Sequence, residues 1–240
     1  MPQGPDEERL ARFPLLRDAD PGLLAEASRH ARWRRVQPNE AVIDYDDTSD
    51  DVFLIISGTV RIAVHSASGQ EVILGDAGAG EIFGEMAAID GLSRSANVTA
   101  INSSVLCSLP QAIFLKLVLQ TPSAGLQLLR LLTARLRLLD ARNVEMAVLP
   151  VRHRLVAELL RQGRPREDGQ LRISPPPPQH VLANRIGARR EAVSRELSAL
   201  QREGLATASR TGIVLLKPDA LREGLRRAMA GDPGKGTKKA

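Results

Sequence analysis

The segment from residue 122 to residue 149 constrains the fold most, because it can form one long helix. Gly125 is the only glycine between Pro122 and Pro150, and no proline interrupts the segment. Residues suited to a helix–helix seam recur alternately three and four positions apart, the spacing of a coiled coil. They are Leu129, Leu132, Leu136, Leu139, Asn143 and Met146. We therefore predict a dimerisation helix over residues 122–149.

A second interpretation of this helix stays open. Leu128, Leu131 and Leu138 lie off the seam, so the helix can also pack against its own domain, and the two contacts are compatible. Asn143 falls at an a position, where paired asparagines cost stability but favour two strands in one register.

Residues 32–110 contain short strand-like runs, with turn signals roughly every ten residues. This spacing is typical of an antiparallel sandwich or barrel. The runs Thr59–Val64 and Glu71–Leu74 are predicted to form a hairpin with Ser68 and Gly69 at its tip. The fold class that follows is α+β, with a β-rich domain and flanking helices over residues 1–121.

The chain after Leu149 forms a further predicted domain, residues 150–230. Pro150 ends the long helix, because proline lacks a backbone donor and restricts the residue before it, and we expect a hinge there. A helix over residues 151–162 follows. Residues 231–240 contain Gly, Pro and Lys and are predicted to form a disordered tail.

Residues 180–204 read as two helices separated by a turn at Gly187. Their apolar residues can share one small core, as a helix-turn-helix requires. These residues are Val181, Leu182, Ile186, Val193, Leu197 and Leu200. Residues 205–216 then read as a two-stranded wing that turns at residues 210–212.

Charge is distributed unevenly along the chain. Residues 1–150 carry 14 Lys and Arg against 19 Asp and Glu, a net charge of −5. Residues 151–240 carry 19 Lys and Arg against 9 Asp and Glu, a net charge of +10. A basic segment of this kind is typical of a nucleic-acid binder, although a merely basic surface is the alternative.

Several classes of protein are disfavoured. No apolar run approaches the ~18 residues of a membrane span, and the N-terminus lacks the pattern of a secretory signal, so we expect a cytoplasmic protein with no membrane contact. Cys107, the single cysteine, is interpreted as a small buried residue. The four histidines are dispersed, and no catalytic triad or P-loop motif is present, so we expect neither an enzyme nor a metal site.

Residues 80–96 combine a glycine turn, a short helix start and an Arg-Ser pair. Helix N-termini present free N–H groups to anions, and an arginine can hold two phosphate oxygens. A carboxylate at Glu85 would repel free phosphate but can accept a hydrogen bond from a sugar hydroxyl, which indicates a nucleotide. The alternative is an ion pair between Arg94 and Glu85 that makes both residues structural.

This stretch resembles the phosphate-binding cassette of cyclic-nucleotide-binding domains. The resemblance implies that Arg94 and Ser95 hold a cyclic phosphate, that Gly84 offers its N–H, and that Glu85 accepts from the ribose 2′-hydroxyl. Met86 belongs to the same expected ligand site.

The long helix closes over the base in this family, and Arg135 matches a family arginine that reaches the pocket. Leu139 and Asp140 stand where the family's cyclic-AMP receptors carry adjacent hydroxyl residues. A carboxylate at Asp140 suits the two donors of guanine better than the single amino group of adenine. The hypothesis is that cGMP binds at least competitively with cAMP; alternatively, Asp140 faces solvent or pairs with Arg137 or Arg142.

The second predicted helix of the helix-turn-helix carries five candidate DNA-binding residues near its start. They are Arg189, Arg190, Glu191, Ser194 and Arg195. Arginine can pair with guanine and glutamate with cytosine in the major groove. The segment is similar to the winged helix-turn-helix of the Crp/Fnr superfamily, and the resemblance covers about residues 15–225. It implies a β-roll, a homodimer, a palindrome of TGTGA-like half-sites, and RNA polymerase as a further partner.

Three rival functions remain at this stage. A haem or gas sensor of the same superfamily would need axial ligands, for which His65 and Cys107 are the obvious candidates. A ligand-independent regulator of that superfamily is the second rival. A cyclic-nucleotide regulatory subunit that binds a protein is the third, and the DNA-reading helix disfavours it.

Overall fold

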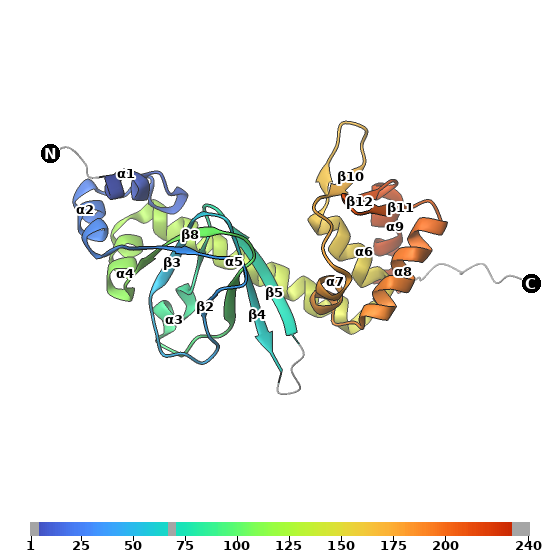
Figure 1. Cartoon of the computed structure of the whole chain (residues 1–240), viewed down its shortest axis with the longest axis horizontal. Coiled ribbons are helices and arrows are strands. Elements are labelled where there is room, and N and C mark those ends of the chain that lie inside the picture. The colour runs from blue at the N-terminus through green and yellow to red at the C-terminus, as the bar shows by residue number, and fades with distance from the viewer. Residues whose placement is uncertain (1–4, 67–70, 232–240) are drawn as a thin grey trace, which may run out of the picture. The chain divides into compact units, whose positions relative to one another are not determined.

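The computed structural model of the chain describes residues 5–66 and 71–231 (Figure 1). It divides into two compact units, one up to Leu136 and one from Arg137 onward, which are described separately. The predicted hairpin tip at residues 68 and 69 and the predicted tail from residue 232 lie outside the described residues.

The first unit contains two four-stranded antiparallel sheets, which form the expected β-roll (Figure 1). The first sheet has the order β1-β8-β3-β6 and the second β2-β7-β4-β5. The strands are β1 (Arg32–Val36), β2 (Ala41–Ile43), β3 (Val52–Ser57), β4 (Thr59–His65), β5 (Glu71–Gly78), β6 (Ile82–Phe83), β7 (Asn97–Ala100) and β8 (Ser104–Leu109). The antiparallel pairing of β4 with β5 confirms the predicted hairpin partners.

Each face of the first sheet covers a hydrophobic core. One core lies between the sheets and includes Val36, Val60 and Leu106. The other lies between the first sheet and the helices, and Cys107 is completely buried in it, as interpreted from the sequence. Burial and the charge of Asp6 raise the pKa of the Cys107 thiol to about 12.

Helices flank this sheet at both ends of the unit. They are α1 (Pro5–Ala11), the 3₁₀ helix η1 (Pro14–Leu16), α2 (Pro21–His30), α3 (Glu85–Asp90), α4 (Gln111–Gln120) and α5 (Pro122–Val148). Asp20 caps α2 through its carboxylate, which accepts from the backbone N–H groups of Gly22 and Leu23. This cap fixes where α2 begins.

The long helix α5 has two apolar faces. Ala124 and Leu128 are buried in the core of the first unit, with Leu131 and Leu132 packed partly against it. The other predicted seam positions are exposed; Leu136, for example, keeps 59% of its surface accessible. The helix α5 therefore packs against its own domain on one face and exposes apolar residues to solvent on another.

The division between the two units falls within α5, after Leu136, and the hinge expected at Pro150 stays a prediction. The last turns of α5 are thus grouped with the C-terminal unit. The predicted domain boundaries at residues 121, 149 and 230 stay predictions.

The second unit contains the expected winged helix-turn-helix. Its helices are α6 (Val151–Gln162), α7 (Gln179–Ile186), α8 (Arg190–Arg202) and α9 (Pro218–Met229), and its strands are β9 (Arg164–Pro165), β10 (Leu171–Ile173), β11 (Ala206–Ser209) and β12 (Gly212–Leu215). The strands form one antiparallel sheet of order β11-β12-β10-β9. All six apolar residues predicted for the helix-turn-helix core are buried.

No single helix in the described part of the chain is long and apolar enough to cross a membrane. The helices α4 and α5 reach that length and composition only as a pair bent by 108°.

Candidate functional site

Gly84 joins β6 to α3 and shapes the centre of the candidate ligand site. Its backbone is left-handed, with φ of 80°, at the N-cap of α3. A Cβ at this position would lie 2.7 Å from Nη1 of Arg94 and 3.0 Å from the carbonyl oxygen of Asp51. The turn therefore needs glycine both for its conformation and for the close approach of Arg94.

Arg94 is buried, with only 3% of its surface exposed. Its Nη1 donates to the carbonyl of Gly84 at 2.9 Å, and its Nη2 donates to the carbonyl of Asp51 at 2.8 Å. Its Nε donates to the hydroxyl of Ser49 at 3.1 Å. A guanidinium has five N–H groups, so these bonds leave two for a ligand. Arg94 consequently holds the loop before β3 against the turn at Gly84.

The charges around Arg94 are mostly negative. Burial lowers the pKa of the Arg94 guanidinium, and the charges of Asp47, Asp51, Asp50 and Glu85 oppose that shift. The pKa of Asp47 is lowered, chiefly because the backbone N–H and the hydroxyl of Ser49 donate to its carboxylate. These carboxylates compete with an anionic ligand for the positive charge of Arg94.

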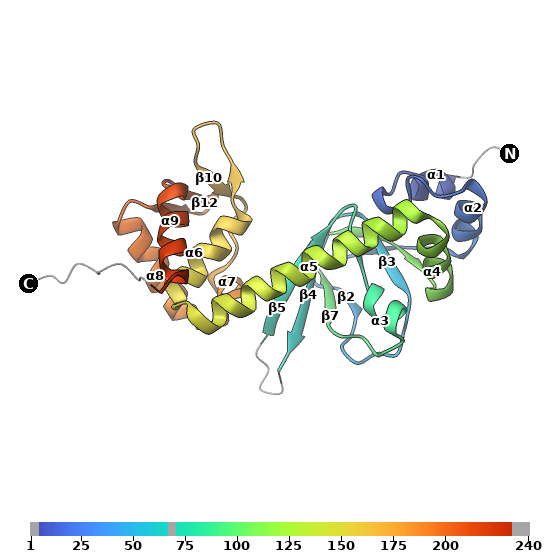
Figure 2. The same ribbon diagram turned by 180° about the vertical axis from the view of Figure 1, so that it is seen from behind.

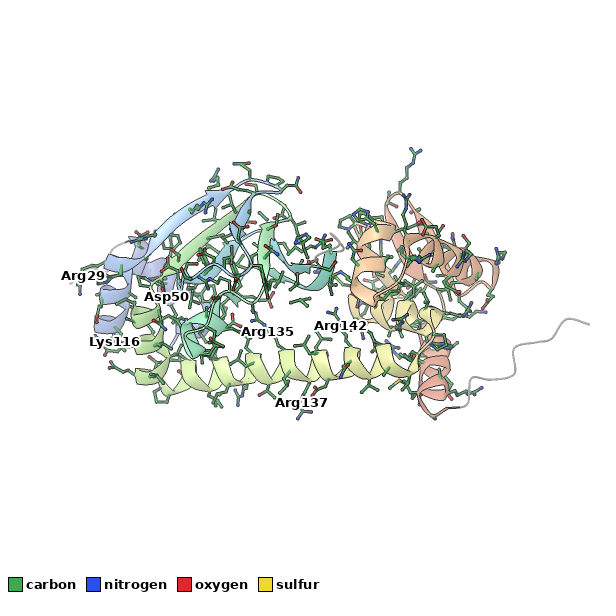
Figure 3. All side chains as sticks on the ribbon, turned by 90° about the horizontal axis from the view of Figure 1, so that it is seen from below. Arg29, Asp50, Lys116, Arg135, Arg137 and Arg142 are labelled. Atoms are coloured by element: carbon green, nitrogen blue, oxygen red, sulfur yellow. The ribbon has the colours of Figure 1, made fainter. Side chains whose placement is uncertain are left out.

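Glu85 begins α3 and is also 3% exposed. Its partner is Arg135 of α5, whose Nη1 lies 2.5 Å from Oε1 of Glu85. The Nη2 of the same arginine donates to the carbonyl of Ile82 at 2.7 Å. Arg135 and Arg137 leave opposite sides of α5 (Figure 3). The structural alternative of an Arg94–Glu85 pair is therefore replaced by an ion pair between Glu85 and Arg135.

Met86 and Ser95 lie next to each other at the surface of this site. Both are exposed, and the hydroxyl of Ser95 lies 3.7 Å from the sulfur of Met86. The structure thus brings the two together beside Gly84, Glu85 and Arg94. Leu139 and Asp140 are exposed residues of α5 that belong to the second unit.

Asp140 forms no ion pair among the described residues, and of its two suggested partners Arg142 pairs instead with Glu158. The suggested pairing of Asp140 with Arg142 is therefore not formed. The side chain of Asp140 is exposed to solvent, which is the other alternative.

Sequence reasoning missed the partners that orient the buried Arg94 and the half-buried Arg135. Arg94 and Arg135 bond to the carbonyls of Asp51, Gly84 and Ile82, and every residue type offers a carbonyl. For Ser49 there was a weak signal in the sequence, because it stands in an aspartate-rich loop where a hydroxyl can bond to both an arginine and a carboxylate.

The candidate DNA-reading residues lie at the start of α8. Arg189 is its N-cap, and Arg190, Glu191 and Arg195 are exposed, while Ser194 is half-buried. Within the described residues, none of these charged side chains forms an ion pair with a neighbour. The buried face of α8, which includes Val193, packs into the core of its unit, so the charged face points to solvent.

Within the described residues, 5–66 and 71–231, no group of three or more His, Cys, Asp or Glu side chains could hold a metal ion.

Comparison with known proteins agrees with both parts of this description. The model of the cyclic nucleotide-binding domain matches residues 33–121, and that of the Crp-like helix-turn-helix domain matches residues 153–223. The chain is 33% identical over 198 residues to the cyclic AMP receptor protein of Thermus thermophilus, which covers 82% of this chain and 89% of that protein.

The fold is shared with known solved structures, of which two are described. The c-di-GMP responsive global regulator CLP of Xanthomonas campestris is 27% identical, with a TM-score of 0.66 over 82% of this chain and 99% of the other. A CooA mutant from Carboxydothermus hydrogenoformans is 20% identical, with a TM-score of 0.72 over 82% of this chain and 88% of the other.

The fold and the site define a DNA-binding transcriptional regulator that contains a cyclic-nucleotide-binding domain. The length of the Thermus alignment and the order of the two matched domains identify the family. The chain belongs to the Crp/Fnr family.

Proposed function

We propose that the protein is a homodimeric regulator whose affinity for a palindromic operator is controlled by a cyclic nucleotide, cAMP or cGMP. The observation that carries this proposal is that Glu85 and Arg94 both lie at the turn of Gly84, where Arg135 of α5 bonds to Glu85. Arg94 and Ser95 take the cyclic phosphate together with the N–H of Gly84. Glu85 accepts from the ribose hydroxyl.

The route from the ligand to α5 passes through Glu85. This carboxylate already accepts a hydrogen bond from Arg135, so a ribose hydroxyl that bonds to it changes the contact that holds α5. A ligand shifts an equilibrium only by its different affinity for the two states. Nucleotide and DNA must therefore raise each other's affinity by the same factor.

The DNA-bound species is a dimer joined along the exposed seam of α5. The seam residues Leu136, Leu139 and Met146 are apolar and exposed, and Asn143 lies among them. A two-fold dimer presents two copies of α8 to two half-sites, so the operator is a palindrome. The resemblance of α8 to the Crp/Fnr reading helix, at Arg190, Glu191 and Arg195, implies TGTGA-like half-sites. RNA polymerase is the further partner proposed for the regulator on its operator.

The first test measures the coupling directly. Fluorescence anisotropy on a labelled TGTGA palindrome at constant salt is recorded without ligand, with cAMP and with cGMP. At least tenfold tighter binding is expected with one nucleotide, about 1.4 kcal/mol of coupling. In Ser95→Ala this gain is expected to fall with the fold intact, because Ser95 is exposed.

A high DNA affinity that neither nucleotide changes would support the second candidate, a ligand-independent regulator. The observation that favours this candidate is that Arg135 donates to the Glu85 carboxylate and to the carbonyl of Ile82, so a protein side chain bonds to the carboxylate that the ribose would use. A parallel titration with c-di-GMP is included, because a relative of 27% identity is described as responsive to that ligand.

The base preference is tested at Asp140. Asp140→Ala is expected to weaken cGMP binding severalfold more than cAMP binding, because guanine offers two donors to a carboxylate. Isothermal titration of both nucleotides into wild type and variant measures the difference. Arg137→Ala, on the same helix, serves as the surface control. Equal dissociation constants for cGMP in the wild type and in Asp140→Ala would show that Asp140 does not contribute to the site.

Direct readout is tested at Arg190. Arg190→Ala is expected to lose about 1–3 kcal/mol of discrimination at one base pair while its affinity for nonspecific DNA stays nearly constant. Competition with single-base operator variants at constant salt measures this. A loss of affinity that is uniform over all sequences would assign Arg190 to phosphate contact instead.

A further inference from the structure

Glu158 is a buried carboxylate on the apolar face of α6. It is 1% exposed and stands between Leu155 and Leu159, which are both completely buried. Its Oε2 accepts from Nη2 of Arg142 at 3.3 Å and from Nε and Nη2 of Arg161 at 3.1 and 3.0 Å. A buried charge of this kind persists only when it is paired.

The other oxygen of Glu158 faces a different helix. Its Oε1 accepts from Gln162 at 2.7 Å and lies 3.5 Å from Nη1 of Arg185. Arg142 comes from α5, seen in Figure 3, and Arg185 comes from α7, the first helix of the helix-turn-helix. One carboxylate therefore stands between the end of the long helix and the DNA-binding motif.

A second ion pair joins the same end of α5 to α6. Arg161 donates to both carboxylate oxygens of Glu145, at 2.6 and 3.1 Å. Burial alone would lower the pKa of Arg161, but its hydrogen bonds to the Glu145 carboxylate and the charge of Glu158 raise that pKa above its ordinary value. Arg161 therefore stays charged and holds Glu145 and Glu158 at once.

The turn of the helix-turn-helix contacts α5 as well. Gly187 ends α7 in a left-handed conformation, with φ of 58°. A Cβ there would lie 3.0 Å from the methyl carbon of Met146. The backbone that leads into the reading helix α8 is thus packed directly against the last turns of α5.

We infer that Glu158 is a positioning residue that fixes the last turns of α5, residues 137–148, to α7, so that these turns move with the DNA-binding motif as one body. The hinge that separates the two units then lies near residue 137 of α5 and not at Pro150. The regulatory part of this inference rests on the proposed function. A change of α5 near Arg135 would reach the reading helix through Glu158.

The physical cost of the cluster supports a geometric role. A buried ion pair gives little net stability, because desolvation of the charges offsets their attraction. Such a group is best explained where it fixes one arrangement of the elements that it joins. Arg161 and Gln162 of α6 itself already bond to the two oxygens of Glu158. The further pairs with Arg142 and Arg185 are therefore the contacts that tie α5 and α7 to this carboxylate.

Hydrogen exchange of the full-length protein tests the inference without any nucleotide. In Glu158→Gln, the amides of residues 138–148 are expected to exchange at least tenfold faster, while those of α8 keep their protection. Arg142→Gln is expected to act in the same way, and it leaves Glu158 with Arg161 and Arg185, so its unit stays folded. Unchanged exchange at residues 138–148 in both variants would overturn the inference.

A control variant removes a carboxylate of the same unit whose ion-pair partner belongs to α6 and not to α5. Glu203 at the end of α8 pairs with Arg152 of α6. Glu203→Gln is expected to leave residues 138–148 protected; acceleration there equal to that of Glu158→Gln would reduce the effect to general destabilisation and overturn the inference.

The regulatory part is measured as the ratio of operator affinities with and without cAMP. Glu158→Gln is expected to bring this ratio toward one, and Glu203→Gln is expected to leave it at the wild-type value. A wild-type ratio retained by Glu158→Gln would overturn the transmission role. A wild-type protein with no response would contradict the proposed function, and the exchange data would still decide whether Glu158 joins α5 to α7.

Discussion

A variant with glutamate at both Leu136 and Leu139 is expected to be monomeric and to lose at least about a hundredfold of its operator affinity. Both leucines are exposed seam positions of α5. In the proposed dimer their replacement would bury unpaired carboxylates that also repel those of the partner. A monomer reaches one half-site at a time, so the second reading helix no longer adds to the affinity.

Analytical ultracentrifugation and anisotropy at constant salt measure the two effects in one sample. Leu138→Glu is the control, because Leu138 is an exposed leucine of the same helix that lies off the seam. This control is expected to stay dimeric with the operator affinity of the wild type. A dimeric double variant, or a Leu138→Glu protein that dissociates equally, would contradict the proposed seam.

The apolar pattern of the helix-turn-helix predicted its fold well, for a physical reason. A helix buries residues at fixed spacing, so Val193, Leu197 and Leu200 could be assigned to one face from the sequence alone, and all three are buried. Gly187 was recognisable as the turn because the chain needs a left-handed residue there.

The sequence motif predicts which side chains form the candidate ligand site, and that assignment stays a prediction. The structure brings Gly84, Glu85, Arg94 and Arg135 together, but which of them pair with each other depends on contacts between distant segments. The motif suggested an Arg94–Glu85 pair as its structural alternative, whereas Arg135, which is fifty residues away in the chain, takes that carboxylate.

The cluster of Glu158 escaped sequence reasoning for a related reason. A glutamate between leucines on α6 conflicts with the apolar face of that helix, which was the available signal. Arg161 is a local partner three residues along α6, but Arg142 and Arg185 come from two other helices, so their proximity follows from tertiary packing and not from local spacing.

Replacement of Arg94 by leucine is expected to have two separable effects. It removes the nucleotide response, and it lowers the free energy of unfolding of the first unit by about 2–4 kcal/mol, because the carbonyls of Gly84 and Asp51 lose their buried donors. Arg94→Lys is expected to keep the charge but recover little stability, since one ammonium cannot reproduce the spread of a guanidinium over three acceptors.

Urea unfolding of the first unit and nucleotide titration at concentrations where each variant is folded measure the two effects separately. Ser95→Ala supplies the comparison, because its exposed hydroxyl serves the ligand without holding the loop. An Arg94→Leu protein as stable as the wild type would show that the three hydrogen bonds contribute nothing net. One that is destabilised yet still binds nucleotide normally would assign Arg94 to the fold alone, and the cyclic phosphate would then depend on Ser95 and the N–H of Gly84.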